Sequence, residues 1–84
     1  MSGVASVESI VAAMRNAQQN IAYHDLHKVC EHYFGKPRNA SSSHAVFKTQ
    51  WPGDPRVNIQ NDKGKAKAYQ VRQVLKAIEK KEGM

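Results

Sequence analysis

Residues 43–51 read Ser-His-Ala-Val-Phe-Lys-Thr-Gln-Trp, and after Pro-Gly-Asp-Pro at 52–55 the chain continues as Arg-Val-Asn-Ile-Gln at 56–60. Because successive side chains of a strand point to opposite faces, each half divides into two sets. The mostly apolar set comprises Ala45, Phe47, Thr49, Trp51, Val57 and Ile59. The mostly polar set comprises His44, Val46, Lys48, Gln50, Arg56, Asn58 and Gln60. The two halves agree, so the sequence predicts an antiparallel hairpin with one buried face and one open face.

Three helices are expected around this hairpin, over 7–19, 25–34 and 68–81. Ser6 is a suitable N-cap for the first helix and Gly35 a suitable C-terminal cap for the second. We expect residues 20–23 to run extended, 36–43 to form a loop or a short edge strand, and 61–64 to form a turn. The apolar stripe of the first helix is expected to pack on the core, with a contact to a second copy or a partner as the alternative. This order predicts an α+β fold with helices on one face of a small antiparallel sheet.

The charge of the chain is concentrated in its second half. The 84 residues carry a net charge of +6. Residues 1–35 hold two basic and three acidic side chains, whereas residues 36–81 hold eleven basic and three acidic ones. A single exposed lysine usually means only a solvated surface, but this asymmetry favours a nucleic acid or an acidic protein as partner.

Cysteine and histidine usage limits other chemistries. Cys30 is the single cysteine, so no intramolecular disulfide and no cysteine zinc cluster is possible. Its helical spacing predicts a buried, inert thiol. His24, His27 and Glu31 share one face of the second predicted helix; a metal site there is the alternative, and a solvated helix face is favoured. With no apolar run of membrane-spanning length and no signal-peptide pattern, a cytoplasmic protein without a membrane partner is expected.

Several short motifs in order resemble a known family. Tyr33-Phe34-Gly35 ends a helix, Ser-Ser-His at 42–44 opens a strand, and Val57-Asn58-Ile59 forms the next strand. Lys63-Gly64-Lys65 then leads into a helix that reads Tyr-Gln-Val-Arg-Gln-Val-Leu-Lys at 69–76. This pattern, over about residues 22–80, resembles the HicA toxins of bacterial toxin–antitoxin systems.

The resemblance implies a double-stranded-RNA-binding-domain-like fold over 22–84, preceded by a helical extension over 1–21. It also implies a bacterial, cytoplasmic mRNA interferase, a metal-independent endoribonuclease without cofactor, that arrests growth until a HicB-type antitoxin binds it. The family histidine that carries catalysis matches His44. Ser42 replaces the family's usual glycine, and Ala45 stands where many members have a second histidine or another large polar residue.

RNA cleavage by this chain requires proton transfer and positive charge. A ribose 2′-OH attacks the neighbouring phosphate with help from a base, an acid and nearby cations. Imidazole changes its charge near neutral pH, which suits His44 for proton transfer. Lys48 and Arg56 lie on the predicted open face and would hold the phosphate, and Ser43 would donate a hydrogen bond.

Two other functions remain open from the sequence. A non-catalytic RNA-binding module would use Lys63, Lys65 and Lys67 before the last helix as phosphate contacts, a role they keep in the nuclease as well. A small subunit of a protein assembly would turn the same basic surface toward an acidic protein.

Overall fold

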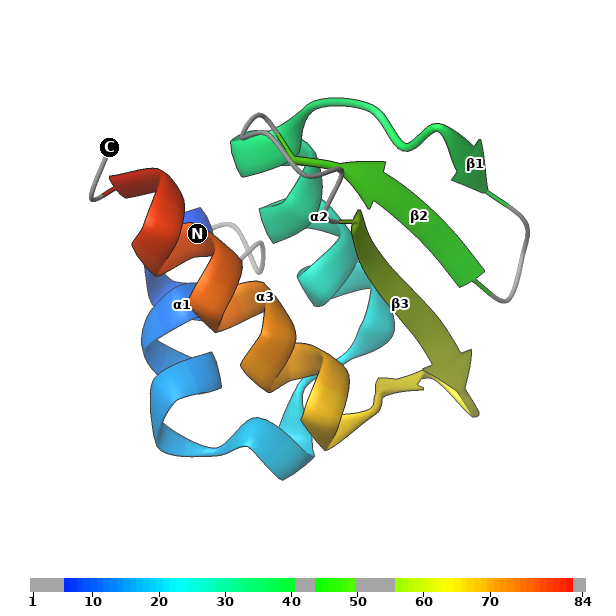
Figure 1. Cartoon of the computed structure of the whole chain (residues 1–84). Helices are drawn as coiled ribbons and strands as arrows, with labels where there is room; N and C mark the ends of the chain where they lie inside the picture. Colours follow the sequence, from blue (N-terminus) through cyan, green and yellow to red (C-terminus); the bar gives the residue numbers. More distant parts are fainter. Residues whose placement is uncertain (1–5, 41–43, 50–55, 83–84) are drawn as a thin grey trace.

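The structure, a computed structural model, describes residues 6–40, 44–49 and 56–82. Within these ranges the elements are α1 (Val7–Asn16), the 3-10 helix η1 (Gln18–Asn20), α2 (Tyr23–Phe34), β1 (Asn39–Ala40), β2 (His44–Lys48), β3 (Arg56–Asp62), β4 (Lys65–Ala66) and α3 (Ala68–Glu82). The strands form one antiparallel sheet in the order β1-β2-β3-β4. The helices lie to one side of this sheet (Figure 1). The predicted α+β class is therefore confirmed.

The pairing of β2 with β3 confirms the predicted division of the hairpin into two faces. Ala45 lies opposite Ile59 and Phe47 opposite Val57, and all four side chains are buried. The alternating residues of both strands point the other way, toward solvent. Thr49 is also buried, as its place in the apolar set requires. Ser43, Gln50, Trp51 and the predicted turn at 52–55 lie outside the described residues.

A second hairpin follows, in which Asn61 and Asp62 continue β3 and pair with β4. The predicted turn at 61–64 is therefore too long, since the reversal occupies only Lys63 and Gly64. Both have positive φ, 54° and 89°, as a two-residue turn between twisted strands requires. The Asn61 side-chain oxygen accepts a hydrogen bond from the Gly64 N–H. Strand β4 is too short to show a hydrophobic alternation, and the sequence did not reveal it.

The helices enclose one core with the inner face of the sheet. Helix α2 packs across β2 and β3, α3 packs along β3, and α1 lies on α2 and α3 (Figure 1). The largest fully buried side chains are Phe47, Met14, Leu26, Ile59, Ile78, Val29, Val71, Val74 and Cys30. Met14 belongs to the first helix, so α1 contributes to the same core as the elements that follow it.

Helix boundaries differ from the prediction by a few residues. Ser6 caps α1, its hydroxyl oxygen accepting from the Ser9 N–H at 3.1 Å. The predicted first helix was too long, because Ala17 leaves the helical conformation (φ −147°, ψ 75°) and the chain continues as η1. Helix α2 begins at Tyr23, two residues early, and Gly35 with φ 86° follows its last residue as predicted. Only Ile21 and Ala22 of the segment 20–23 are extended.

Truncation of two neighbouring β2 residues tests the face assignment. Phe47→Ala removes a fully buried ring and should lower the free energy of unfolding by about 3–5 kcal/mol. Lys48→Ala removes an exposed side chain and should change it by no more than about 0.5 kcal/mol. Urea denaturation followed by circular dichroism measures both. Equal decreases in the two variants would contradict the assignment.

Candidate nucleic-acid interface

The outer face of β2 and β3 is the side of the sheet away from the described helices (Figure 1). We call it the open face and define it by His44, Val46, Lys48, Arg56, Asn58 and Gln60. Val46 is half-buried, and the other five residues are exposed. His44 lies opposite Gln60, and Lys48 lies opposite Arg56. A histidine, two cations and two amides thus share one accessible surface.

The cations of the open face lie at the far end from His44. His44 and Lys48 are the first and last residues of β2, so their backbones are about 13 Å apart at the usual rise of a strand. Arg56 stands opposite Lys48 and is equally remote. The expectation that these two side chains hold the phosphate next to His44 stays a prediction.

The β3–β4 hairpin supplies cations at the end where His44 lies. Gln60, opposite His44, is two residues from Asp62, and Asp62 pairs with Lys65. Lys65 is exposed and belongs to the same side of the sheet as Asp62, while Lys63 occupies the turn itself. Lys67 is half-buried just before α3. Lys65 lies two strands across and two residues along from His44, about 12 Å away by the usual strand spacings, so the lysine cluster and the pair Lys48 and Arg56 flank the histidine at similar distances. Ser43, the remaining predicted site residue, lies outside the described residues.

Gln70 connects α3 to the sheet beside this site. Gln70 is polar, and from the sequence alone it would be expected on the solvent side of the last helix; that expectation is wrong, because the residue is only 5% exposed. Its Oε1 accepts a hydrogen bond from the Gln60 N–H at 2.8 Å. Its Nε2 donates to the Tyr69 hydroxyl at 3.4 Å, and Tyr69 itself is half exposed. A backbone N–H at a strand edge needs a hydrogen-bond partner. Gln70 supplies that partner for Gln60, the residue that pairs with His44 across the other edge of β3.

The histidines of α2 are not part of the open face. The His24 side chain is 85% exposed, with Nε2 3.3 Å from Asp25 Oδ1. His27 lies 3.2 Å from Glu31 through Nδ1, and its ring packs edge-on against Phe47 with centroids 5.4 Å apart. The favoured solvated face is therefore wrong for His27, which borders the core. Among the described residues, no group of three histidine, cysteine, aspartate or glutamate side chains is arranged to hold a metal ion.

Cys30 is buried, as its spacing predicted. Burial, with a smaller contribution from the charge of Glu31, raises the pKa of the Cys30 thiol far above its ordinary value. Because the thiolate is the reactive form, this side chain is a poor nucleophile at neutral pH.

No protein-family model, curated protein or solved structure matches this chain. Within the part of the chain that the structure describes, no helix is long and apolar enough to cross a membrane. A function is therefore inferred from the geometry of the open face and of the hairpin beside it.

Removal of the Gln70 side chain tests its link to β3. Gln70→Ala leaves the Gln60 N–H without its partner and should lower the free energy of unfolding by about 1–3 kcal/mol. Amide hydrogen exchange at Gln60 should accelerate in the same variant. Tyr69→Phe, which removes only the longer hydrogen bond, is the matched control and should leave exchange at Gln60 unchanged. Unaltered exchange at Gln60 in Gln70→Ala would contradict the link.

Proposed function

We propose that this chain is an endoribonuclease of the HicA toxin type that binds RNA on its open face and cleaves it with His44. One observation carries the proposal: an exposed histidine on an open strand face, at the end of the sheet where a lysine-rich hairpin lies. Along the chain, the strands of the antiparallel sheet follow α2 and precede α3. This order supports the double-stranded-RNA-binding-domain-like assignment.

The proposed reaction is an intramolecular transesterification at one phosphate. His44 takes the proton of the ribose 2′-OH as the 2′-oxygen forms its bond to phosphorus. The bond from phosphorus to the 5′-oxygen breaks, and that oxygen receives a proton from the His44 imidazolium or from water. The products are a 2′,3′-cyclic phosphate and a 5′-hydroxyl, with no net oxidation and no group bound to the protein. Lys63 and Lys65 stabilise the charge that develops on the phosphate oxygens.

The remaining cations bind the RNA on either side of the cleaved bond. Lys48 and Arg56, about 13 Å along the strand from His44, contact phosphates there. Lys67 adds charge just before α3. Phosphate contacts position a nucleic acid but carry no sequence information by themselves. The proposed site therefore fixes the register of the RNA through charge and the position of cleavage through His44.

The proposed protein partner is a HicB-type antitoxin that covers the open face. Val46 gives this face an apolar contact, and its cations suit an acidic partner. In this proposal residues 22–84 form the HicA-like unit and residues 1–21 form its N-terminal extension. A bound antitoxin would prevent RNA from reaching His44 and so relieve growth inhibition.

A second candidate is an RNA-binding module without catalysis. It is favoured by the hairpin lysines, which would bind phosphates whether or not a proton-transfer group stands beside them. Incubation of the purified protein with long RNA and a chelator separates the two functions. Cleavage supports the nuclease, whereas a mobility shift with intact RNA supports the binding module.

Substitution of His44 tests the nuclease. His44→Ala removes an exposed side chain from the polar face and should change the free energy of unfolding by about 0.5 kcal/mol or less. Loss of a general acid or base should lower the rate of RNA cleavage by roughly 10²–10⁴-fold while RNA binding persists. Gel assays measure RNA cleavage and RNA binding. Growth assays measure toxicity, and circular dichroism measures folding.

The controls for His44 are the two exposed histidines of α2. His24→Ala and His32→Ala should cleave RNA at the parental rate, because neither residue lies on the open face. His27→Ala is unsuitable, since that ring packs on Phe47. Cleavage by His44→Ala at the parental rate would show that this histidine is not catalytic.

Removal of the hairpin charges tests the RNA interface. Replacing Lys63, Lys65 and Lys67 together with alanine should weaken RNA binding and flatten its dependence on salt. The log–log slope should change by about one unit or slightly less for each phosphate that the variant no longer neutralises. Fluorescence anisotropy over a range of salt concentrations measures the slope. A slope equal to that of the parent would place the RNA elsewhere.

A further inference from the structure

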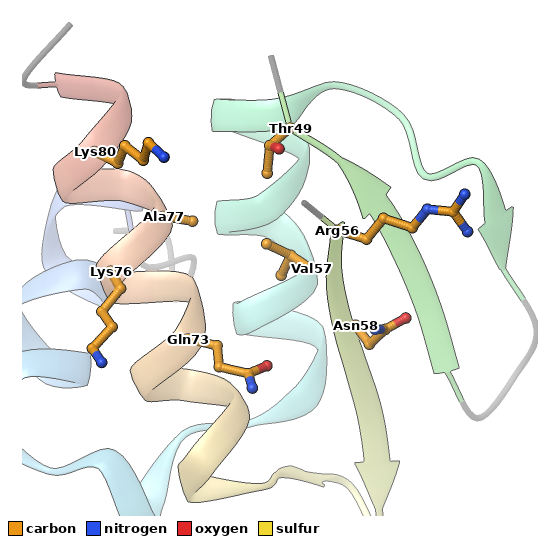
Figure 2. Close-up of a pocket in the computed structure, with 8 residues that line it drawn as sticks. All are labelled: Thr49, Arg56, Val57, Asn58, Gln73, Lys76, Ala77 and Lys80. Carbon is orange, nitrogen blue, oxygen red and sulfur yellow. The ribbon is translucent and has the colours of Figure 1, made fainter. Parts of the chain in front are cut away.

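A groove lies between α3 and the edge of β3 that faces away from β2. It has a volume of about 340 Å³, and its lining includes Arg56, Val57, Asn58, Lys76, Ala77 and Lys80. Val57 and Ala77 point toward each other from the strand and the helix and form an apolar floor (Figure 2). The side chains of Arg56 and Asn58 point away from α3, so these two residues border the groove with their backbone (Figure 2).

The edge of β3 that faces the groove is not covered along its whole length by strand β4. Strand β4 pairs with Asn61 and Asp62, and the chain then enters α3 at Ala68. The Gln60 N–H points to this same edge, where it donates to Gln70. Because backbone groups alternate between the two edges of an antiparallel strand, the N–H and C=O of Asn58 also point there, into the groove. Strand β4 therefore occupies this edge at the C-terminal end of β3, and the groove runs along the same edge toward the N-terminal end of β3.

The charge of the groove selects its occupant. The described residues that line it include Lys76 and Lys80, both exposed on α3, but no acidic side chain. An extended peptide can pair with a strand edge through its backbone and place alternate side chains on either side. The side chains that such a peptide turns toward α3 would lie over Val57 and Ala77 and beside Lys76 and Lys80, so carboxylates in this row would meet the two lysines.

We propose that this groove binds an extended, acidic segment of a protein partner, which adds to the sheet as a strand along β3. A nucleic acid is less suited to the site, since it offers no groups for the apolar floor or for the alternating N–H and C=O of a strand edge. The proposal is independent of RNA cleavage, because the groove lies along the edge of β3 and the open face lies on the outer surface of the sheet. The chain then has a second cationic surface, separate from the open face, that takes an extended protein segment.

The probe is a fluorescein-labelled peptide of four Glu-Val repeats, with a peptide of four Lys-Val repeats and a uridine octanucleotide as competitors. Anisotropy should rise with the acidic peptide, and neither competitor should displace it. Lys76→Glu should weaken peptide binding by about tenfold, since an attractive surface charge becomes repulsive. Lys36→Glu changes the net charge equally at an exposed residue that does not line the groove, and it should keep the affinity within about twofold.

Strand addition is tested by two substitutions at one position. Asn58→Pro removes the N–H that points into the groove, and proline is tolerated where an edge N–H faces outward. Binding should fall by about tenfold in Asn58→Pro and stay unchanged in Asn58→Ala. In the parent protein, hydrogen exchange of the Asn58 amide should slow when the peptide is added. If Asn58→Pro does not fold, this exchange measurement alone shows whether the peptide binds by strand addition.

Three results would overturn the proposal. Equally weakened binding in Lys76→Glu and Lys36→Glu would show that the peptide responds to the net charge of the protein and not to the groove. Unslowed exchange at Asn58 in the presence of bound peptide would exclude strand addition. Displacement of the peptide by the uridine octanucleotide, together with weaker RNA binding in Lys76→Glu, would make the groove part of a nucleic-acid surface.

Discussion

The register between β2 and β3 determines both what the core buries and what the sheet exposes. It places Phe47 opposite Val57 in the core and His44 opposite Gln60 on the open face. A shift by one residue would exchange the two faces, expose Phe47 and bury charged side chains. The free energy of burying Phe47 and Ile59 under α2 therefore also fixes which side chains meet solvent, so core packing and the proposed site are specified together.

The edge of β3 has three consecutive environments that the same register creates. Strand β4 pairs with Asn61 and Asp62, the Gln70 side chain bonds Gln60, and the groove borders Asn58. Exposed strand edges attract unwanted pairing, and proteins commonly cover them. Here a short strand and one glutamine cover part of the edge and α3 flanks the rest. One strand thereby borders both the open face and the groove for a second partner.

Residue patterns predicted most of the fold and only part of the site. The alternation of apolar and polar residues in 44–49 and 56–60 reflects burial, which recurs at a fixed period and can be read locally. Gln70 followed no such pattern, because its partner is a backbone N–H ten residues earlier. Likewise His27 packs on Phe47, and Lys48 stands far from His44; both facts require the register of distant segments.

Transesterification at His44, as proposed, leaves characteristic ends on the cleaved RNA. Mass spectrometry can identify the ends of the RNA fragments that the purified protein produces in the presence of EDTA. Attack by a 2′-OH leaves a 2′,3′-cyclic phosphate on one fragment and a 5′-hydroxyl on the other, and we expect these ends. Fragments that carry 5′-phosphates, or RNA that stays intact, would contradict the proposal.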